Sequence, residues 1–354
     1  MMRSLLSLRS LSVVVLCLIA APAVSQEARQ KFIAKDAVPN TVLVVRSTTD
    51  ISIFAPALET FVAANPSVEV DYEQWGSNAL YADSLAACEG TVRPADVVIS
   101  SGVHQMVDLV NRACANTYQS EFTAQLPGAR RWRDELWGIT REAAVIIYNT
   151  DLVSAEDAPR TRFALLDLMR RSSDDFMGKI ATYDVEASGL GFLFAFMDSQ
   201  EATTFGGLLE GFARVDAVAT CCSAEIIEGV DSGRYKIAYN VLGSYVDTVP
   251  HENLGVIYPE DYTLFLSRAF MIPKGAQHGA TAGAFLDFLL SPQGRAVLSQ
   301  STLIHDSNSD ETAANDSAER YIPIGPTLLV AMDRHRRARF IEKWRDTFGE
   351  HAVE

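Results

Sequence analysis

The chain has 354 residues, of which 48% are hydrophobic and 21% are charged, the composition of a globular protein with enough apolar material for two cores. Its formal charge of −15 at pH 7 argues against nucleic acid and anionic lipid as partners, because a strongly acidic surface repels both. After residue 25 no apolar run reaches the length of about 18 residues that a membrane-spanning helix needs, so we expect none there.

The first 25 residues have the pattern of a secretory signal peptide. Arg3 and Arg9 supply positive charge, residues 11–21 form a short apolar run, and small residues precede an expected cleavage site after Ser25. Loss of this segment removes two arginines and no acids, which takes the formal charge of residues 26–354 to −17. We therefore expect an exported, periplasmic protein.

The first half of the remaining chain repeats one pattern three times. After a polar leader at 26–40, each strand runs into a loop rich in Ser, Thr, Gly or Asn and then into a helix. This rhythm predicts a doubly wound α/β sheet whose polar loops lie at the carboxyl edge of the strands. The expected elements are strand 42–46, helix 51–65, strand 68–72, helix 79–87, strand 95–99 and helix 103–113.

Two apolar strands are expected to carry the chain between two lobes. The first, 143–148, is a nearly continuous apolar run, which suits a strand covered on both faces. The second is 263–271. We therefore expect a first lobe of residues 40–142 plus 268–354, a second lobe of residues 143–267, and hinge strands near 140–148 and 263–271.

The rest of the chain is expected to contain both helices and strands. The expected elements are helix 163–170, strand 179–182, helices 192–198 and 223–229, strands 237–239 and 254–257, and helices 281–290, 293–299 and 331–348. Residues 307–316 are polar and acidic and are expected to form an exposed loop. The arginines of helix 331–348 are interpreted as a solvated face rather than an anion site.

Four cysteines would remain after export, in an oxidising compartment. Cys88 and Cys114 flank one strand–helix unit, and we predict a disulfide between them. Cys221 and Cys222 are neighbours, and a disulfide between neighbours is strained. They also lack the CxxC or HxxxH spacing of a metal site, so a thiol pair or a disulfide is favoured over metal ligation.

Hydroxyl-rich loops precede helices in both halves of the chain. A helix N-terminus has unpaired N–H groups and partial positive charge, so several that converge can bind an oxyanion without basic side chains. Arg141, at the first crossing, would either clamp a carboxylate or phosphate or form an ion pair. The candidate ligand-binding residues are Ser47, Thr48, Thr49, Asp50, Trp75, Ser77, Ser100, Ser101, Arg141, Ser188, Gly189, Asn240, Ser244 and Tyr245.

Enzyme motifs are missing from the sequence. It has no GxSxG, HExxH or Walker A motif and no GxGxxG after a strand. None of the six histidines lies at ligand spacing from another. We therefore expect no enzymatic activity, no cofactor and no bound metal.

Several stretches resemble the type II periplasmic solute-binding proteins of ABC importers, in the group with iron(III)- and sugar-phosphate-binding members (family 1 extracellular solute-binding proteins). They are VLVVRSTTD, ADVVISSG, LWGITREAAVIIYNTDL, SAEIIEGVDSGRYKIAYNVLGSY and FMIPKGAQHGATAGAFLDFLLSPQGRAVL. The last is the most specific. The resemblance covers roughly residues 40–300 and implies two α/β lobes that close on a ligand, with an ABC permease of the inner membrane as transient partner.

The resemblance also bears on the ligand. Ferric members bind iron with a His and a Glu of the first lobe and a consecutive Tyr pair of the second. Here the matching first loop, Ser47 to Asp50, has no histidine, and Tyr245 stands alone. The loop of Ser188 and Gly189 matches the segment that holds an anion in such proteins. The resemblance thus implies a small anionic organic solute, such as a sugar phosphate, phosphonate or carboxylate.

Three alternatives stay open at this point. One is a carrier of ferric or another metal ion that uses Tyr245, Tyr239 and Asp50. Another is a secreted hydrolase or transferase on the same fold. A third is a solute sensor that presents its closed form to a receptor kinase, which uses the same closure as transport. In each case a monomer is expected.

Overall fold

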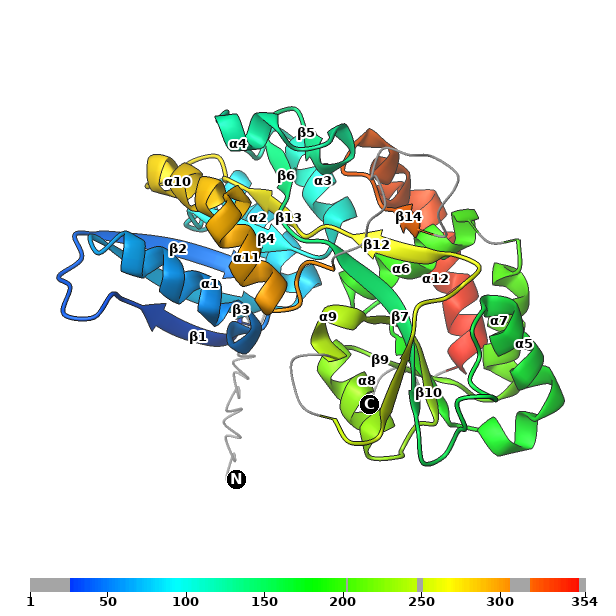
Figure 1. Cartoon of the computed structure of the whole chain (residues 1–354). Coiled ribbons are helices and arrows are strands. Elements are labelled where there is room, and N and C mark those ends of the chain that lie inside the picture. Colours follow the sequence, from blue (N-terminus) through cyan, green and yellow to red (C-terminus); the bar gives the residue numbers. More distant parts are fainter. Residues whose placement is uncertain (1–25, 202, 247–250, 306–318, 350–354) are drawn as a thin grey trace, which may run out of the picture.

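The computed structural model describes residues 26–201, 203–246, 251–305 and 319–349, which fold into two α/β lobes side by side (Figure 1). The expected signal peptide at 1–25 and the whole of the expected acidic loop at 307–316 lie outside the described residues. Among the described residues, none of the helices combines the length and apolarity that crossing a membrane requires. The α/β class with two lobes is the one that the sequence predicts.

The first lobe is built on a seven-stranded mixed sheet. In spatial order its strands are β1 (Gln26–Phe32), β3 (Val68–Trp75), β2 (Thr41–Ser47), β4 (Val97–Ser100), β13 (Ala269–Met271), β6 (Leu136–Gly138) and β5 (Arg131–Trp132). Its helical segments are α1 (Ile51–Ala64), α2 (Ser77–Cys88), α3 (Val103–Asn111), α4 (Glu121–Ala124), η1 (Gly128–Arg130), α10 (Gly279–Leu290) and α11 (Pro292–Gln300). Strands β2, β3 and β4 run parallel, so the loops that follow them meet at one edge of the sheet.

The second lobe contains the other sheet. Its strands are β14 (Glu319–Tyr321), β12 (Thr263–Leu266), β7 (Glu142–Asn149), β10 (Ile237–Leu242), β8 (Ile180–Tyr183) and β9 (Val218–Thr220), with β11 (Leu254–Ile257) also paired to β7. Its helical segments are α5 (Arg162–Arg171), η2 (Ser173–Phe176), α6 (Gly189–Glu201), α7 (Phe205–Arg214), α8 (Ser223–Asp231), α9 (Gly243–Val246) and α12 (Arg334–Phe348). The short helix η3 (Pro326–Met332) packs between α3 of the first lobe and α12. Every residue of β7 is buried, as its apolar run predicts.

The chain crosses between the sheets at two places. It leaves the first sheet after β6 and enters the second at β7, and it returns between β12 and β13. The second crossing is therefore two short strands in different sheets, joined by Ser267 and Arg268, and not the single strand 263–271 that the sequence suggested. The pair between β12 and β7 ends at Leu266 and Glu142, which brings both crossings together.

Strand β14 and helix α12 lie with the second lobe, whereas we expected all of residues 268–354 in the first. Strand β14 pairs in parallel with β12, and α12 packs beside α7 (Figure 1). Trp344 and Phe348 are buried in the core of the second lobe, with ring centroids 4.6 Å apart. Aromatic side chains spaced four residues apart form one face of a helix, and this apolar face decides where α12 docks.

The polar leader is partly an edge strand rather than unstructured chain. Strand β1 pairs antiparallel with β3, and its basic side chains lie opposite acidic ones. Arg29 donates to both carboxylate oxygens of Asp71, and Lys31 donates to Glu69 over 2.6 Å. Opposite charges across a strand pair stabilise it, and this polar pairing replaces the apolar alternation that marks most strands.

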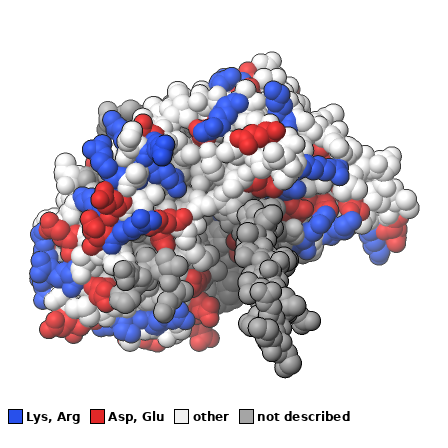
Figure 2. Space-filling view, turned by 180° about the vertical axis from the view of Figure 1, so that it is seen from behind, with Lys and Arg blue, Asp and Glu red and all other residues white. Residues whose placement is uncertain are grey.

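The disulfide between Cys88 and Cys114 is present, as predicted, with the two Cα atoms 5.2 Å apart. It ties the end of α2 to the turn after α3, inside the first lobe. Acidic and basic side chains are interspersed over the face seen in Figure 2, without one broad basic surface. An anion site in this protein must therefore be built locally.

A candidate ligand-binding site between the lobes

A cleft of about 470 Å³ lies where the two lobes meet. Seven of the candidate ligand-binding residues line it, from strand-end loops and helix starts of both lobes. They are Thr48, Asp50, Trp75, Ser77, Ser101, Ser188 and Tyr245. The ends of β2, β3 and β4 and the segments directly after them supply the first five, because these parallel strands end at the same edge.

Three helices of the cleft begin at its wall. Helix α2 comes from the first lobe, and α6 and α8 come from the second. The N-cap residues Gly76 and Cys222 make no side-chain capping bond to α2 and α8. Among the described residues, no hydrogen-bond partner is found for the backbone N–H groups of Ser77, Asn78, Ala79, Leu190, Ser223 and Ala224, all of which line the cleft. Each helix end thus presents free donors and partial positive charge to the same space.

Hydrogen bonds join the two lobes directly across the cleft. The Gly189 N–H donates to Ser77 Oγ over 2.8 Å, and Asn78 Nδ2 donates to the carbonyl oxygens of Glu186 and Ala187 over 2.7 and 3.0 Å. Gly189 therefore contributes by holding the lobes together rather than as a lining residue. The structure shows the lobes in contact, as expected for a cleft that closes on its contents.

A second bridge joins the lobes at Tyr245. Its hydroxyl donates to Asp50 Oδ1 over 3.1 Å, and the Asp50 N–H approaches the same hydroxyl at 3.4 Å. Burial raises the pKa of Tyr245 well above its usual value, so the phenol stays protonated and keeps its donor. Burial also raises the pKa of Asp50, against the opposing effects of Tyr245 and the nearby Arg268.

Arg268 is a cleft residue that the sequence reasoning missed. Its guanidinium bonds both carboxylate oxygens of Glu142, over 2.9 and 3.1 Å, and also donates to the Thr48 carbonyl oxygen. Burial alone would lower the pKa of Arg268. Glu142 and Tyr245 together raise this pKa by more than burial lowers it, so Arg268 keeps its positive charge. The positive charge is largely neutralised by Glu142, and the pair ties the two crossings together.

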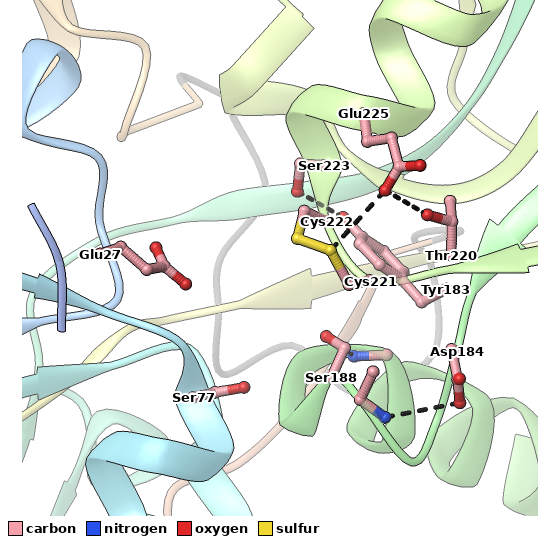
Figure 3. Close-up of a disulfide and its surroundings, with 12 residues drawn as sticks. Glu27, Ser77, Tyr183, Asp184, Ser188, Thr220, Cys221, Cys222, Ser223 and Glu225 are labelled. Carbon is pink, nitrogen blue, oxygen red and sulfur yellow. Dashed lines mark hydrogen bonds between the residues drawn. A yellow bond between two sulfur atoms is a disulfide. The ribbon is translucent and has the colours of Figure 1, made fainter. Parts of the chain in front are cut away.

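Two carboxylates face the cleft from the first lobe. Gln74 Nε2 lies 3.2 Å from an oxygen of Glu27 and 3.2 Å from an oxygen of Asp50, so it bridges the two. Glu27, on β1, points toward the open space of the cleft in Figure 3. It was missed because the leader was not expected to form a strand. These oxygens can accept hydrogen bonds from a ligand.

Three candidate residues do not line the cleft, and two of them use their hydroxyls to shape the loops. Ser47 Oγ accepts the Thr49 N–H over 3.0 Å, and Ser100 Oγ accepts the Gly102 N–H over 3.0 Å. The carbonyl oxygen of Thr49 accepts a hydrogen bond from Tyr72, and the residue is fully buried. Short side chains that bond their own backbone fix the turn at each strand end.

The other three candidates lie away from the cleft wall. Ser244 Oγ donates to Glu142 over 2.5 Å, beneath the cleft. Asn240 has a positive φ of 60° and bonds Asp198, in a buried polar cluster of the second lobe. Arg141 pairs with Glu319 of β14 over 3.0 Å, so the ion-pair interpretation of this residue is the one that the structure supports.

Cys221 and Cys222 form a disulfide on the cleft wall, directly before α8 (Figure 3). Both residues are exposed. Next to them the hydroxyls of Tyr183 and Ser223 are bonded over 2.6 Å, and burial raises the pKa of Tyr183 to about 12. The sequence had left the state of this cysteine pair open.

Comparisons with known proteins agree with this geometry. Residues 93–325, well over half of the chain, match the family model described as bacterial extracellular solute-binding protein. The chain belongs to this family. The predicted resemblance is thereby confirmed, and so is the expectation of a protein without enzymatic activity, because this is a family of solute-binding proteins. No curated protein matches the chain.

Solved structures of other solute-binding proteins share the fold. The substrate-binding protein of an ABC transporter from Agrobacterium tumefaciens is 29% identical, with a TM-score of 0.83 over 91% of this chain and 98% of that one. The ferric binding protein from Campylobacter jejuni is 18% identical, with a TM-score of 0.67 over 85% and 99%. The periplasmic binding protein AfuA from Actinobacillus pleuropneumoniae, solved with fructose-6-phosphate, is 16% identical, with a TM-score of 0.67 over 88% and 99%. The two at lower identity show the fold alone.

Proposed function

We propose that this solute-binding protein captures a small anionic organic solute in the cleft and delivers it to an ABC permease of the inner membrane. One observation carries the proposal. The N-termini of α2, α6 and α8 converge on the cleft with free backbone donors, while the only basic side chain on the described cleft wall, Arg268, is already paired. An anion is the ligand that such helix ends favour.

The interaction energies of helix ends with an anion are large enough for selective binding. A helix end carries roughly half an elementary charge, and its interaction with an anion reaches up to about 2 kcal/mol in a partly buried site. Three such ends supplement the direct hydrogen bonds from hydroxyls such as those of Ser77, Ser101 and Ser188. Backbone donors thus replace basic side chains, in a protein whose overall charge is strongly negative.

The carboxylates of Glu27 and Asp50 narrow the choice of ligand among small anionic organic solutes. They would repel a second anionic group, but they accept hydrogen bonds from hydroxyl groups. A phosphorylated sugar has one anionic end and several hydroxyl donors. We therefore place sugar phosphates ahead of phosphonates and carboxylates that lack hydroxyls.

The test is a thermal-shift screen that pairs each anionic compound with its uncharged parent, such as a sugar phosphate with the free sugar. A ligand at 100 times its Kd stabilises the folded protein by about 2.7 kcal/mol, which gives a clear shift. We expect shifts from anionic members only. A neutral or cationic solute that stabilises the protein when no anion does would refute the proposal.

A matched pair of variants tests whether the thermal shift depends on the cleft end of α6. Ser188→Ala removes a cleft hydroxyl at the start of α6 and should weaken the shift. Ser199→Ala removes a hydroxyl that bonds the Phe196 carbonyl oxygen near the other end of α6, and it should leave the shift unchanged. Equal shifts in both variants would remove Ser188 from the site.

A ferric ligand is the competing proposal from the sequence. The oxygen atoms that would ligate the iron do not all lie at one site. Tyr239 donates to Asp198 over 2.6 Å within the second lobe and does not line the cleft with Tyr245. Among the described residues, no group of three or more His, Cys, Asp or Glu side chains is arranged to hold a metal ion. A visible tyrosinate-to-iron absorption band after addition of ferric citrate would restore this alternative.

The cellular setting is part of the proposal. Export to the periplasm, cleavage after Ser25 and a monomeric state remain predictions, which cell fractionation, N-terminal sequencing and light scattering would check. Transport differs from presentation to a sensor kinase in one respect: only transport should require the permease genes. Uptake of the identified solute that persists without this protein would contradict the transport role.

A further inference from the structure

The two disulfides of this protein have different settings. The bond between Cys88 and Cys114 lies inside the first lobe, where Cys114 is only 2% exposed, and closes a loop across 26 positions. The bond between Cys221 and Cys222 joins neighbours, and both residues are exposed on the cleft wall. A cross-link between neighbours restricts almost none of the unfolded chain, so stabilisation by loop closure does not account for it.

The surroundings of the two sulfur atoms of this pair differ in charge. Cys222 is the N-cap of α8, and the N–H groups of Ser223 and Ala224 behind it have no partner among the described residues. A thiolate at a helix N-terminus is stabilised by these donors and by the partial positive charge. Reduced Cys222 would therefore hold a negative charge at neutral pH.

The environment of Cys221 is the opposite. A carboxylate oxygen of Glu225 lies 3.7 Å from its Sγ, and the same oxygen accepts a hydrogen bond from Thr220 (Figure 3). A disulfide sulfur carries no hydrogen, so the approach of Glu225 to sulfur is a contact and not a hydrogen bond. A carboxylate at this distance disfavours a second negative charge, so reduced Cys221 would keep its proton.

We propose that the disulfide of Cys221 and Cys222 is a thiol-exchange site, at which a low-molecular-mass thiol or a dithiol protein reduces the pair. The incoming thiolate bonds to one sulfur as the Cys221–Cys222 bond breaks, and a second thiol then resolves the mixed disulfide. The two thiols supply two electrons and leave as a disulfide. Of the two thiol protons, one is taken up by Cys221 and the other is released to water, so the protein is left with a Cys222 thiolate and a protonated Cys221.

This exchange also affects the ligand, in a way that rests on the proposed function. The Cys222 thiolate would lie at the start of α8, one of the three helix ends that we expect to hold the anionic group. It would occupy the same donors and repel the ligand. The oxidised protein is thus the form that binds the anion, and the reduced protein is the form that releases it.

The first experiment measures the exchange without any ligand. Purified protein is treated with graded concentrations of dithiothreitol, alkylated with iodoacetamide and digested with trypsin, and the tryptic peptide 215–234 contains both cysteines. We expect this peptide to be alkylated at reductant concentrations that leave Cys88 and Cys114 bonded. The proposal would be overturned if the Cys88–Cys114 bond opened first or if both disulfides opened at the same reductant concentration. It would also be overturned if peptide 215–234 were found without a disulfide before any reductant was added.

The second experiment measures which sulfur carries the charge. Cys221→Ser leaves Cys222 as a free thiol, and Cys222→Ser leaves Cys221, so the two variants are matched controls. We expect Cys222 to react faster with iodoacetamide at pH 7 and to lose its reactivity at a lower pH than Cys221. Superimposable pH profiles would overturn the assignment of the thiolate to Cys222.

The third experiment measures the effect on anion binding by titration calorimetry with glycerol 3-phosphate and inorganic phosphate. We expect the reduced protein to bind at least about tenfold more weakly, because this is already the effect of one added negative charge about 10 Å away at an effective dielectric constant of about 20, and the thiolate would lie closer than that. A double variant, Cys221→Ala with Cys222→Ala, adds no charge and should bind like the oxidised protein. Equal affinity of the reduced and oxidised proteins would overturn the link to the ligand. If neither form binds either anion, the proposed function fails for these anions, and the peptide experiment still decides whether the pair exchanges.

Discussion

His104 makes the contact between the lobes sensitive to acid. It lies on α3 of the first lobe, and its ring packs on Phe192 of α6 in the second, with ring centroids 5.3 Å apart. The side chain is fully buried, and neither ring nitrogen has a hydrogen-bond partner among the described residues. Burial, with a smaller contribution from the charge of Arg337, lowers the pKa of His104 to about 3.

The sign and size of the effect follow from this pKa. In the unfolded chain a histidine has a pKa of about 6.5, so below that pH the unfolded state binds a proton that folded His104 does not take up. The free energy of unfolding therefore falls as the pH drops from about 6.5 towards 3. Between pH 7 and pH 5 the loss from this residue is about 2 kcal/mol, since one pKa unit corresponds to about 1.4 kcal/mol.

Urea unfolding at pH 7, 6 and 5 measures this loss. His104→Gln removes the titrating group, so the variant should lose about 2 kcal/mol less than the parent protein over this range. His335→Gln, which changes an exposed histidine on α12, is the control and should keep the parent's pH dependence. The reasoning is refuted if the free energy of unfolding of His104→Gln and of the parent protein changes equally with pH. His104 would then have the same pKa in the folded and unfolded states.

The remaining predictions test closure, the charge pair at the crossings and the buried disulfide. In Gly189→Ala the new Cβ would lie 2.7 Å from Oε1 of the buried Gln105 of the first lobe, so the Gln105 amide must shift, closure should cost about 1 kcal/mol more, and small-angle X-ray scattering should show a larger radius of gyration. An unchanged radius would contradict this. Arg268→Met leaves a buried carboxylate unpaired and should lower the free energy of unfolding by about 3–5 kcal/mol in urea, whereas a loss under about 1 kcal/mol would mean that the pair is solvated. Cys88→Ser with Cys114→Ser should cost about 3 kcal/mol in the same assay, and no loss would show that the cross-link is not formed.

The fold was predictable where apolar patterns are strong. The buried strand β7 and the three strand–loop–helix units of the first lobe follow from runs of apolar residues between polar loops. Strand β1 was missed because ion pairs, rather than apolar side chains, hold it to β3. The docking of α12 was missed because its arginines were interpreted as a solvated face, whereas Phe340, Trp344 and Phe348, which recur every four residues, form the apolar face that packs on the second lobe.

The cleft was predictable where a loop follows a parallel strand, and much less so elsewhere. Thr48 and Ser77 line the cleft because the topology alone brings such loops together. Asn240 was misplaced because an irregular register between β10 and β7 and a positive φ lead its side chain to Asp198, and local patterns do not reveal such a register. Trp75 has its ring against the guanidinium of Arg46, 5.5 Å from its centroid, so its role combines packing with lining.

The alternation of side chains along a strand bears on the prediction that Arg141 binds the ligand. Successive side chains of a strand point to opposite faces, so Arg141 and Glu142 cannot both face the cleft. Glu142 points toward Arg268, beneath the cleft, and Arg141 consequently points toward Glu319 on β14. A charged pair at neighbouring positions of a crossing strand can therefore place at most one residue toward the cleft side, and here neither of the two lines the cleft.

The position of the acidic residues explains why the site would use backbone groups. Glu27 and Asp50 lie on the cleft wall, and Arg268 is neutralised by its own partner, so the side chains alone would give the cleft a negative potential. Helix dipoles are fixed and do not titrate, whereas a basic side chain could be neutralised by those carboxylates. Free N–H groups of α2, α6 and α8 can therefore attract an anion next to two carboxylates. The same argument makes Cys222 important, because a thiolate at this N-cap would add a second negative charge to an end of α8 that already holds Glu225 in its first turn.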